Sequence, residues 1–189
     1  MHTAYVTVRN ALLQLLAEGD RHGYQLKVDF EARTGGIWPL NVGQVYTTLE
    51  RLVRDGQVVP SATGEGDQRT YAITDDGRRE VKAWLDSSPV DNDPPRDELI
   101  MKVLVAIGRG GVEAIGVIDA QRGALLVALQ MGRRQQRRRN EDHDWAPRLA
   151  HDAVLTRIEA DVTWLDRCEA LLRAAAPEPT RPQSTRRTR

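Results

Sequence analysis

The stretch Asn41–Gly56, NVGQVYTTLERLVRDG, decides the fold of the first half of this chain. Its apolar residues recur at i, i+4, i+7 and i+8, the spacing of one side of a helix: Val45, Leu49, Leu52 and Val53. The opposite side is polar and carries Thr47, Arg51 and Arg54, with Gln44 at its edge. Asn41 can cap the first turn and Gly56 can end the helix. We therefore predict an amphipathic helix whose polar face suits the base edges and phosphates of a DNA major groove.

Around this helix the pattern predicts further helices and a hairpin. Two helices cover about residues 5–17 and 23–33, and Gly35, Gly36 and Pro39 interrupt the chain after the second. Downstream, Gln57–Ser61 and Gln68–Ile73 are strand-like runs on either side of the turn signal Gly64–Asp67. Thr74 is the expected N-cap of a helix that reaches about residue 86. Helix, helix and hairpin in this order predict a winged helix-turn-helix.

Several short motifs give the chain a specific resemblance to the PadR-type transcriptional regulators. They are His22–Leu26 (HGYQL), Thr34–Leu40 (TGGIWPL), Gly43–Tyr46 (GQVY), Leu49–Leu52 (LERL) and Tyr71–Gly77 (YAITDDG). They stand in the family's order and spacing across most of the first 88 residues, and Asp97–Lys102 (DELIMK) resembles the start of the family's C-terminal helical region. The resemblance implies a DNA-binding dimer that assembles through its C-terminal helices. The family often has more basic residues where this chain has Thr47 and Glu50, so we expect its phosphate contacts to be weaker and do not carry over the family's base preference.

Composition excludes several other classes of protein. The chain has 189 residues, as many Lys and Arg as Asp and Glu, and a single cysteine, Cys168, which excludes an internal disulfide framework and suits a reducing cytosol. The N-terminus lacks the pattern of a signal peptide, and no apolar run approaches the ~20 residues that cross a membrane. No catalytic motif is recognisable, and the histidines do not have metal-ligand spacing. We therefore expect a cytoplasmic protein that is not an enzyme and holds neither metal nor cofactor.

The C-terminal half is predicted to be helical. A linker at 89–95 separates a DNA-binding domain, 1–88, from a helical domain, 96–176, and the tail 177–189 is expected to be disordered. The helices cover about residues 96–107, 111–139 and 147–175. The last of them shows a/d spacing, interrupted by Glu169, at Leu155, Ile158, Val162, Leu165 and Leu172. We expect this coiled-coil seam to join two subunits, because helix-turn-helix proteins gain specificity by reading two half-sites. The alternative is a helical hairpin within one chain, against residues 111–139.

The same helical region is where we expect an effector to bind. Trp145 and Trp164 offer aromatic surfaces, and an arginine-rich run offers positive charge: Arg133, Arg134, Arg137, Arg138 and Arg139. These features suit an aromatic or anionic small molecule, and the resemblance adds that some family members bind flat aromatic compounds there. The plainer interpretations are core packing for the tryptophans and a solvated helix end for the arginines.

The sequence therefore predicts a mainly α protein with a small β-hairpin wing, in which a winged helix-turn-helix domain precedes a C-terminal α-helical dimerisation domain. We expect a repressor that responds to a small molecule and binds a palindromic DNA operator as a homodimer. The expected DNA contacts are Tyr24, Asn41, Gln44, Tyr46, Thr47, Arg51, Arg54 and Arg69. The alternative is a winged-helix protein–protein interaction module that does not bind DNA. It is favoured by the slight acidic excess of residues 1–88, since DNA-binding domains usually carry a basic footprint.

Overall fold

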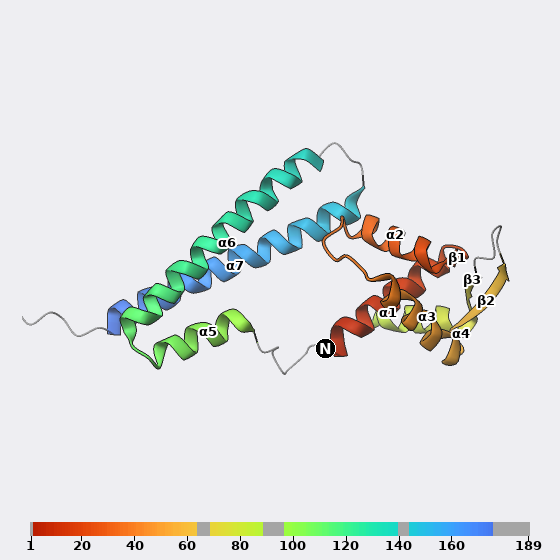
Figure 1. The fold of residues 1–189 in the computed structure, drawn as a ribbon, viewed down its shortest axis with the longest axis horizontal. Helices are drawn as coiled ribbons and strands as arrows, with labels where there is room; N and C mark the ends of the chain where they lie inside the picture. Colours follow the sequence, from red (N-terminus) through yellow and green to blue (C-terminus); the bar gives the residue numbers. More distant parts are fainter. Residues whose placement is uncertain (1, 64–68, 89–96, 140–143, 176–189) are drawn as a thin grey trace, which may run out of the picture. The chain divides into compact units, whose positions relative to one another are not determined.

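A computed structural model describes residues 2–63, 69–88, 97–139 and 144–175 (Figure 1). In chain order the elements are α1 (His2–Ala17), β1 (Arg21–His22), α2 (Gly23–Arg33), α3 (Val42–Arg54), β2 (Val58–Thr63), β3 (Arg69–Ile73), α4 (Asp75–Asp86), α5 (Glu98–Ile107), α6 (Gly111–Arg139) and α7 (Trp145–Ala175). The chain divides into two compact units, residues 1–93 with 138–153, and residues 94–137 with 154–189. The boundary between residues 93 and 94 falls within 89–95, where we placed the division, and the other two boundaries fall inside α6 and α7. The predicted linker and tail lie outside the described residues.

The first unit contains the predicted helix-turn-helix and a small antiparallel sheet. Its strands are ordered β1-β3-β2, with Val58 opposite Ile73 and Arg21 opposite Tyr71. The hairpin of β2 and β3 is confirmed, although its predicted turn at Gly64–Asp67 lies outside the described residues. Strand β1 was not predicted, because two residues are too short to show a period. The fold is mainly α, as expected, but the wing belongs to a three-stranded sheet.

The helix ends of this unit are fixed by local side-chain caps. The Asn41 side chain accepts a hydrogen bond from the Gly43 amide at 2.8 Å, and the Thr74 hydroxyl accepts one from the Gly77 amide at 3.1 Å. After α3, Gly56 has a φ of 73°, the left-handed conformation that glycine adopts without strain. These caps satisfy backbone groups that a helix end leaves unpaired, so α3 and α4 begin where the sequence places them.

One apolar core holds the helix-turn-helix, the sheet and α4 together. It consists of Leu12, Leu13, Leu15, Leu16, Leu26, Phe30, Leu40, Val45, Leu49, Leu52, Val58, Tyr71, Ile73 and Val81. The predicted apolar side of α3 is part of this core, with Val53 packed at its margin. Since Val45, Leu49 and Leu52 are almost completely buried, the rotation of α3 about its axis is fixed by the core.

The second unit is built from α5, α6 and α7. Helices α6 and α7 are antiparallel (Figure 1), with ion pairs from Arg133 to Glu159 at 2.6 Å and from Arg122 to Glu169. The core here is formed by Val103, Ile118 and Leu165, all fully buried, with Leu99, Leu125, Trp164, Cys168 and Leu172 packed around them. None of the described helices is long and apolar enough to cross a membrane.

The a/d seam of α7 packs within the chain. Leu165 has no exposed surface, and Leu155 lies so close to α6 that a Cβ on Gly132 would come within 2.5 Å of its Cδ2 atom. Ile158, Val162 and Leu172 are partly buried. The hairpin that we considered as the alternative therefore exists within one chain, and Leu155 and Leu165 are already covered before a second subunit is present. Glu169, which interrupts the seam, faces Arg122 of α6.

Candidate DNA-binding surface

The polar face of α3 lies opposite the core, as the sequence predicts. Gln44, Thr47, Arg51 and Arg54 are all exposed, while Thr48 on the core side turns its hydroxyl to the carbonyl oxygen of Gln44 at 2.7 Å. The face is therefore available to a double helix, whose major groove admits an α-helix.

The structure also shows how these side chains are distributed around α3. With about 100° between successive residues, the middle of the exposed face falls between Gly43, Thr47, Glu50 and Arg54. Gln44 and Arg51 lie about 70–90° from that middle, on the flank of the helix. Sequence reasoning named Gln44 and Arg51 but did not name Glu50 as a site residue, although the positions i, i+4, i+7 and i+11 from Gly43 could have identified this stripe.

Two of the predicted residues, Tyr24 and Tyr46, place aromatic rings where α2 meets α3. Tyr24 is 57% exposed, and its hydroxyl has no hydrogen-bond partner among the described residues. Tyr46 is 40% exposed and its ring lies against Gly23, where a Cβ would be 2.7 Å from the Tyr46 Cε1 atom. The motifs HGYQL and GQVY therefore meet in space, because only glycine leaves room for the ring of Tyr46 on α2.

The remaining predicted contacts surround α3. Asn41 uses its side-chain oxygen as the N-cap, so its amide group is the part left for a phosphate. Arg54 pairs with Asp55 at 3.1 Å, an exposed contact that solvent screens. Arg69 begins β3 and is exposed. Close by, burial raises the pKa of the Tyr71 hydroxyl, Arg69 lowers it, and Tyr46 and Glu50 raise it further.

Many acidic side chains around β1 and α2 are paired with cations, so the net charge of this unit is a poor guide to whether it binds DNA. Its acidic side chains are largely matched there by neighbouring cations: Arg21 with Asp29 at 2.6 Å, Lys27 with Glu31 at 2.7 Å, and Arg33 with Glu18 at 2.6 Å. The slight acidic excess is therefore not concentrated on α3. The potential at a bound DNA depends mainly on α3 and the wing, because interactions between exposed charges are screened within about 10 Å.

The residues predicted to form an effector site belong to both units, Trp145 to the first and Trp164 to the second. Trp164 is partly buried in the α5–α7 core, whereas Trp145 is 67% exposed, with the Arg148 guanidinium 4.9 Å from the centre of its ring. Arg133 pairs with Glu159, and Arg134 and Arg137 are exposed. The side chains of Arg138 and Arg139 lie outside the described residues.

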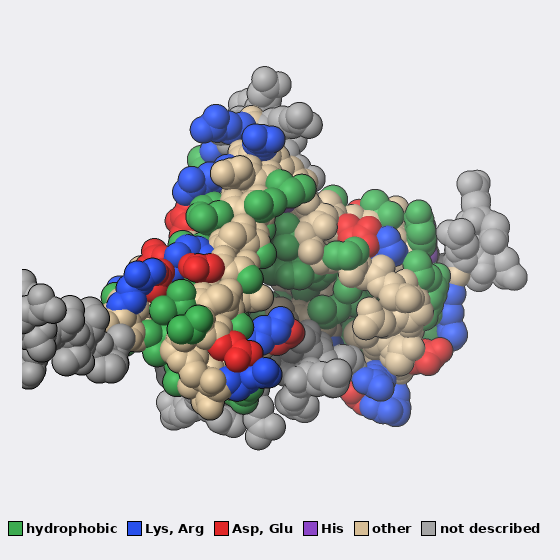
Figure 2. All heavy atoms as spheres, turned by 60° about the vertical axis from the view of Figure 1, so that its left-hand side comes forward, with side chains coloured by type: hydrophobic (Ala, Val, Ile, Leu, Met, Phe, Trp, Pro, Cys, Tyr) green, Lys and Arg blue, Asp and Glu red, His purple; other side chains and the backbone are tan. Residues whose placement is uncertain are grey.

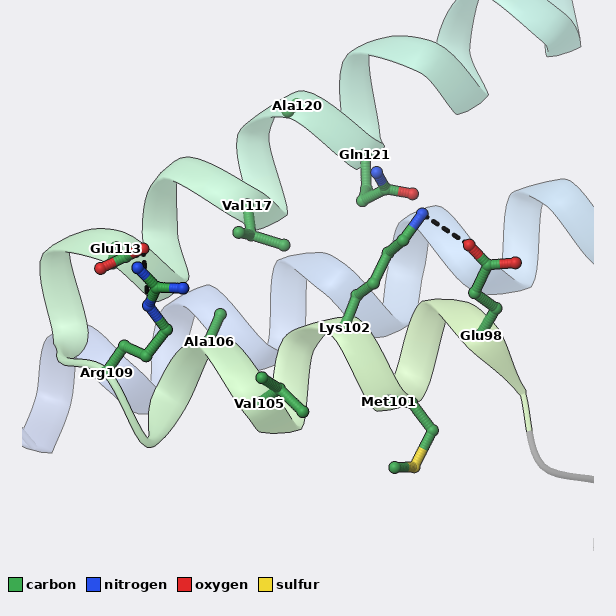
Figure 3. Close-up of a pocket in the computed structure, with 10 residues that line it drawn as sticks. All are labelled: Glu98, Met101, Lys102, Val105, Ala106, Arg109, Glu113, Val117, Ala120 and Gln121. Atoms are coloured by element: carbon green, nitrogen blue, oxygen red, sulfur yellow. Dashed lines mark ion pairs between the residues drawn. The ribbon is translucent and has the colours of Figure 1, made fainter.

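A groove that sequence reasoning missed runs between α5 and α6 (Figure 3). It has a volume of about 530 Å³ and is walled by Met101, Val105, Ala106, Val117 and Ala120. Its charged side chains pair with each other, Lys102 with Glu98 at 2.8 Å and Arg109 with Glu113 at 2.9 Å. The groove is therefore apolar along its length and nearly neutral at its rim. It could not be predicted because it depends on how α5 packs on α6.

Helix α5 also exposes a second apolar surface. Ile100, Leu104 and Ile107 stand at i, i+4 and i+7, on the side of α5 away from the groove, and they are 42%, 55% and 42% exposed. We call these three residues the α5 stripe. Figure 2 shows apolar side chains exposed along this unit, with Lys and Arg gathered towards the end of α6. A helix that is apolar on nearly all sides is normally buried, so the α5 stripe indicates an interface.

Fold and surface together define a winged helix-turn-helix protein with a free recognition helix. Residues 12–83 match the family described as "Transcriptional regulator PadR-like family". The chain is 26% identical over 176 residues to the "Negative transcriptional regulator PadR" of Bacillus subtilis (strain 168), across 87% of this chain and 97% of that protein. Residues 12–83 thus form a domain of the PadR-like family, which is a family of transcriptional regulators. Among the described residues, no group of His, Cys, Asp and Glu side chains is arranged to hold a metal ion.

Solved structures of this fold are similar over nearly the whole chain. Crystal structures of Bacillus subtilis PadR include a complex with operator DNA (TM-score 0.68, 22% identity, covering 88% of this chain and 99% of that one) and a complex with p-coumaric acid (TM-score 0.70, 22% identity, covering 88% and 98%). The virulence activator AphA of Vibrio cholerae is also similar (TM-score 0.66, 22% identity, covering 89% and 99%). These likenesses establish the fold of both halves of the chain.

Proposed function

We propose that the protein is a repressor that binds a palindromic operator as a homodimer and responds to a small aromatic molecule. The observation that carries the proposal is the rotation of α3, which the core fixes with its polar side outward. Tyr24, Asn41 and Arg69 lie on neighbouring elements of the same unit, where they can position the helix against phosphates while α3 contacts bases. The name and the operator complex of the Bacillus subtilis relative support both repression and operator binding.

Gel-shift measurements with the DNA upstream of the protein's own gene, over a series of salt concentrations, test DNA binding. Binding that weakens steeply with salt is expected, because contacts to phosphates release counterions. If the Gln44 side chain makes a bidentate contact with a base, Gln44→Ala should reduce the preference for that base by about 1–3 kcal/mol. No binding at low salt would favour the protein-interaction module. A reporter gene behind this DNA then separates repression from activation, which matters because the Vibrio cholerae protein with this fold is an activator.

The homodimer is proposed on the α5 stripe. Leu155 and Leu165 of α7 are buried within the chain, and Leu165 packs in the core with Val103 of α5, whereas Ile100, Leu104 and Ile107 remain exposed. A second copy would bury these three side chains against its own. A dimer with a two-fold axis presents two recognition helices, which suits half-sites spaced by about one helical turn or a multiple of it.

The variant Leu104→Asp tests this interface without disturbing the core, unlike a charge placed at Leu165. Burial of an unpaired carboxylate is costly, so light scattering should report a monomer. Operator affinity should fall by more than about tenfold, since each half-site then binds independently. The matched control is Thr156→Asp on α7, an exposed position that already carries a polar side chain. A Leu104→Asp protein that stays dimeric at micromolar concentration would show that the stripe is not the interface.

For the effector we propose the α5–α6 groove. Its apolar walls suit a flat aromatic ring, and its volume suits a molecule of the size of p-coumaric acid, which the Bacillus subtilis relative binds. Trp164 packs against the core that contains Val103 of α5, so it is the tryptophan expected to report binding by its fluorescence. A ligand releases DNA only if it binds the DNA-free conformation more tightly than the DNA-bound one.

Titration of p-coumaric acid and related aromatic acids into the operator complex tests this site. Val105→Phe fills the groove and should abolish release while leaving operator binding intact. Val127→Phe, on an exposed part of α6 outside the groove, is the control. Release that is equally efficient from both variants would place the effector elsewhere, as would release that depends on Arg133, Arg134 and Arg137 instead.

A further inference from the structure

Glu50 places a negative charge on the exposed face of α3, the face that is proposed to approach the negatively charged DNA. The buried residues Val45, Thr48, Leu49 and Leu52 define the inner side of the helix. With about 100° per residue, Glu50 lies about 30° from the middle of the opposite side, nearer to it than Gln44 or Arg51. Glu50 is exposed. Any approach of this face to a major groove therefore brings a carboxylate to the base edges.

No ion pair holds this carboxylate among the residues that the structure describes. Arg54 is the residue one turn along the same face, and it pairs with Asp55. Among the described residues Glu50 forms no ion pair, in contrast to Glu18 and Glu31 of the same unit. A negative charge is thus kept on the DNA side of α3, where it repels phosphates and weakens binding to DNA in general. Such a charge favours binding only where a base donates a hydrogen bond to it.

The hydrogen-bond donors and acceptors of the bases determine which base can pair with the Glu50 carboxylate. In the major groove cytosine presents an amino donor at N4, whereas guanine presents the acceptors N7 and O6 and thymine presents the acceptor O4. Adenine presents an amino donor at N6 but an acceptor at N7 beside it, which opposes the second carboxylate oxygen. Gly43 lies two turns before Glu50 in the same stripe and has no side chain, so α3 can enter the groove deeply.

We propose that Glu50 is a specificity-determining residue that accepts a hydrogen bond from the N4 amino group of a cytosine in each operator half-site. This assignment rests on the proposed operator binding and adds a base preference to it. Glu50 lowers affinity for unrelated DNA and for half-sites with guanine or thymine at that position. Discrimination between cytosine and these bases is expected to lie between about fivefold and 100-fold.

Selection from a randomised DNA library, followed by binding measurements on single-base variants of the selected site, tests the assignment with the full-length protein. The wild type should select a cytosine in each half-site. Glu50→Gln should prefer adenine at that position, because a glutamine amide pairs with adenine N6 and N7. Glu50→Ala should lose preference there and bind unrelated DNA more tightly. Asp86→Asn on α4 removes the same charge from the same unit and should change neither the selected sequence nor the preference.

The outcomes separate this inference from the proposed function. If the wild type selects a sequence and Glu50→Gln and Glu50→Ala select the same base at every position, operator binding stands and the role of Glu50 is wrong. If the wild type selects no sequence, operator recognition itself is wrong and the role of Glu50 is lost with it. Glu50→Asp keeps the charge but is one methylene shorter, so retention of the full cytosine preference by this variant would also overturn a direct contact.

Discussion

The contact between Gly23 and Tyr46 makes the packing of α2 on α3 testable by a double-mutant cycle. An alanine Cβ at position 23 would lie 2.7 Å from Cε1 and 2.8 Å from Cζ of Tyr46, whereas ordinary contacts begin at 3.4 Å. The ring must therefore move by about 0.7 Å, and overpacking of this kind costs about 1–3 kcal/mol. Because Tyr46 is 40% exposed, the ring can turn towards solvent, and we expect a cost near the lower end of that range, about 1 kcal/mol.

The cycle consists of the wild type, Gly23→Ala, Tyr46→Ala and the double variant, measured by urea unfolding and by operator affinity. In the Tyr46→Ala background the steric cost disappears, and the better helix propensity of alanine contributes up to about 1 kcal/mol in the opposite direction. Because the propensity gain is the same in both backgrounds and cancels, we expect a coupling equal to the steric cost, about 1 kcal/mol. Gly123→Ala on α6, where a Cβ meets no atom within 4 Å, is the control and should stabilise slightly. Equal effects of Gly23→Ala in both backgrounds would refute the proposed contact.

Three further predictions concern the wing, the sheet and the helical unit. Arg69→Ala should weaken binding to all DNA sequences by a similar factor and reduce the slope of log affinity against log salt by about one unit per lost phosphate contact. A change of base preference would contradict a contact between Arg69 and the DNA phosphates. Gly77→Ala should cost about 1–3 kcal/mol in urea unfolding, because its Cβ would collide with the carbonyl oxygen of Gln57, and a cost no larger than that of Gly123→Ala would contradict this packing. The hydrogen bond from Arg122, followed by that from Arg173, lowers the pKa of Glu169 below 4.5, so the ion pair stabilises the fold above that pH and is lost as pH falls through the lowered pKa. The stability difference between wild type and Glu169→Gln should therefore be present near neutral pH and vanish in acid, and a pH-independent difference would contradict it.

Much of the fold was determined by local sequence. The bounds of α2 and α6 were predicted as they are, and α3 and α4 begin after the expected caps Asn41 and Thr74. Helix caps, glycine turns and apolar periodicity act within a few residues, so they can be read without knowledge of the rest of the chain. The polar face of α3 follows for the same reason, since its exposure is the consequence of a buried stripe on the other side.

What the tertiary structure decided depends on partners distant in sequence. Strand β1 exists because β3 supplies its hydrogen bonds, and two residues carry no period of their own. The a/d spacing of α7 identified an apolar seam but could not identify its partner, because Leu165 packs equally well in principle against another chain or against Val103 and Ile118 of its own. In the sequence Glu169 only interrupts that seam, whereas the tertiary structure shows that it pairs with Arg122 of α6. The groove and the stripe of α5 arise only when three helices meet, since a helix that is apolar all round does not reveal in its sequence which side faces its own core.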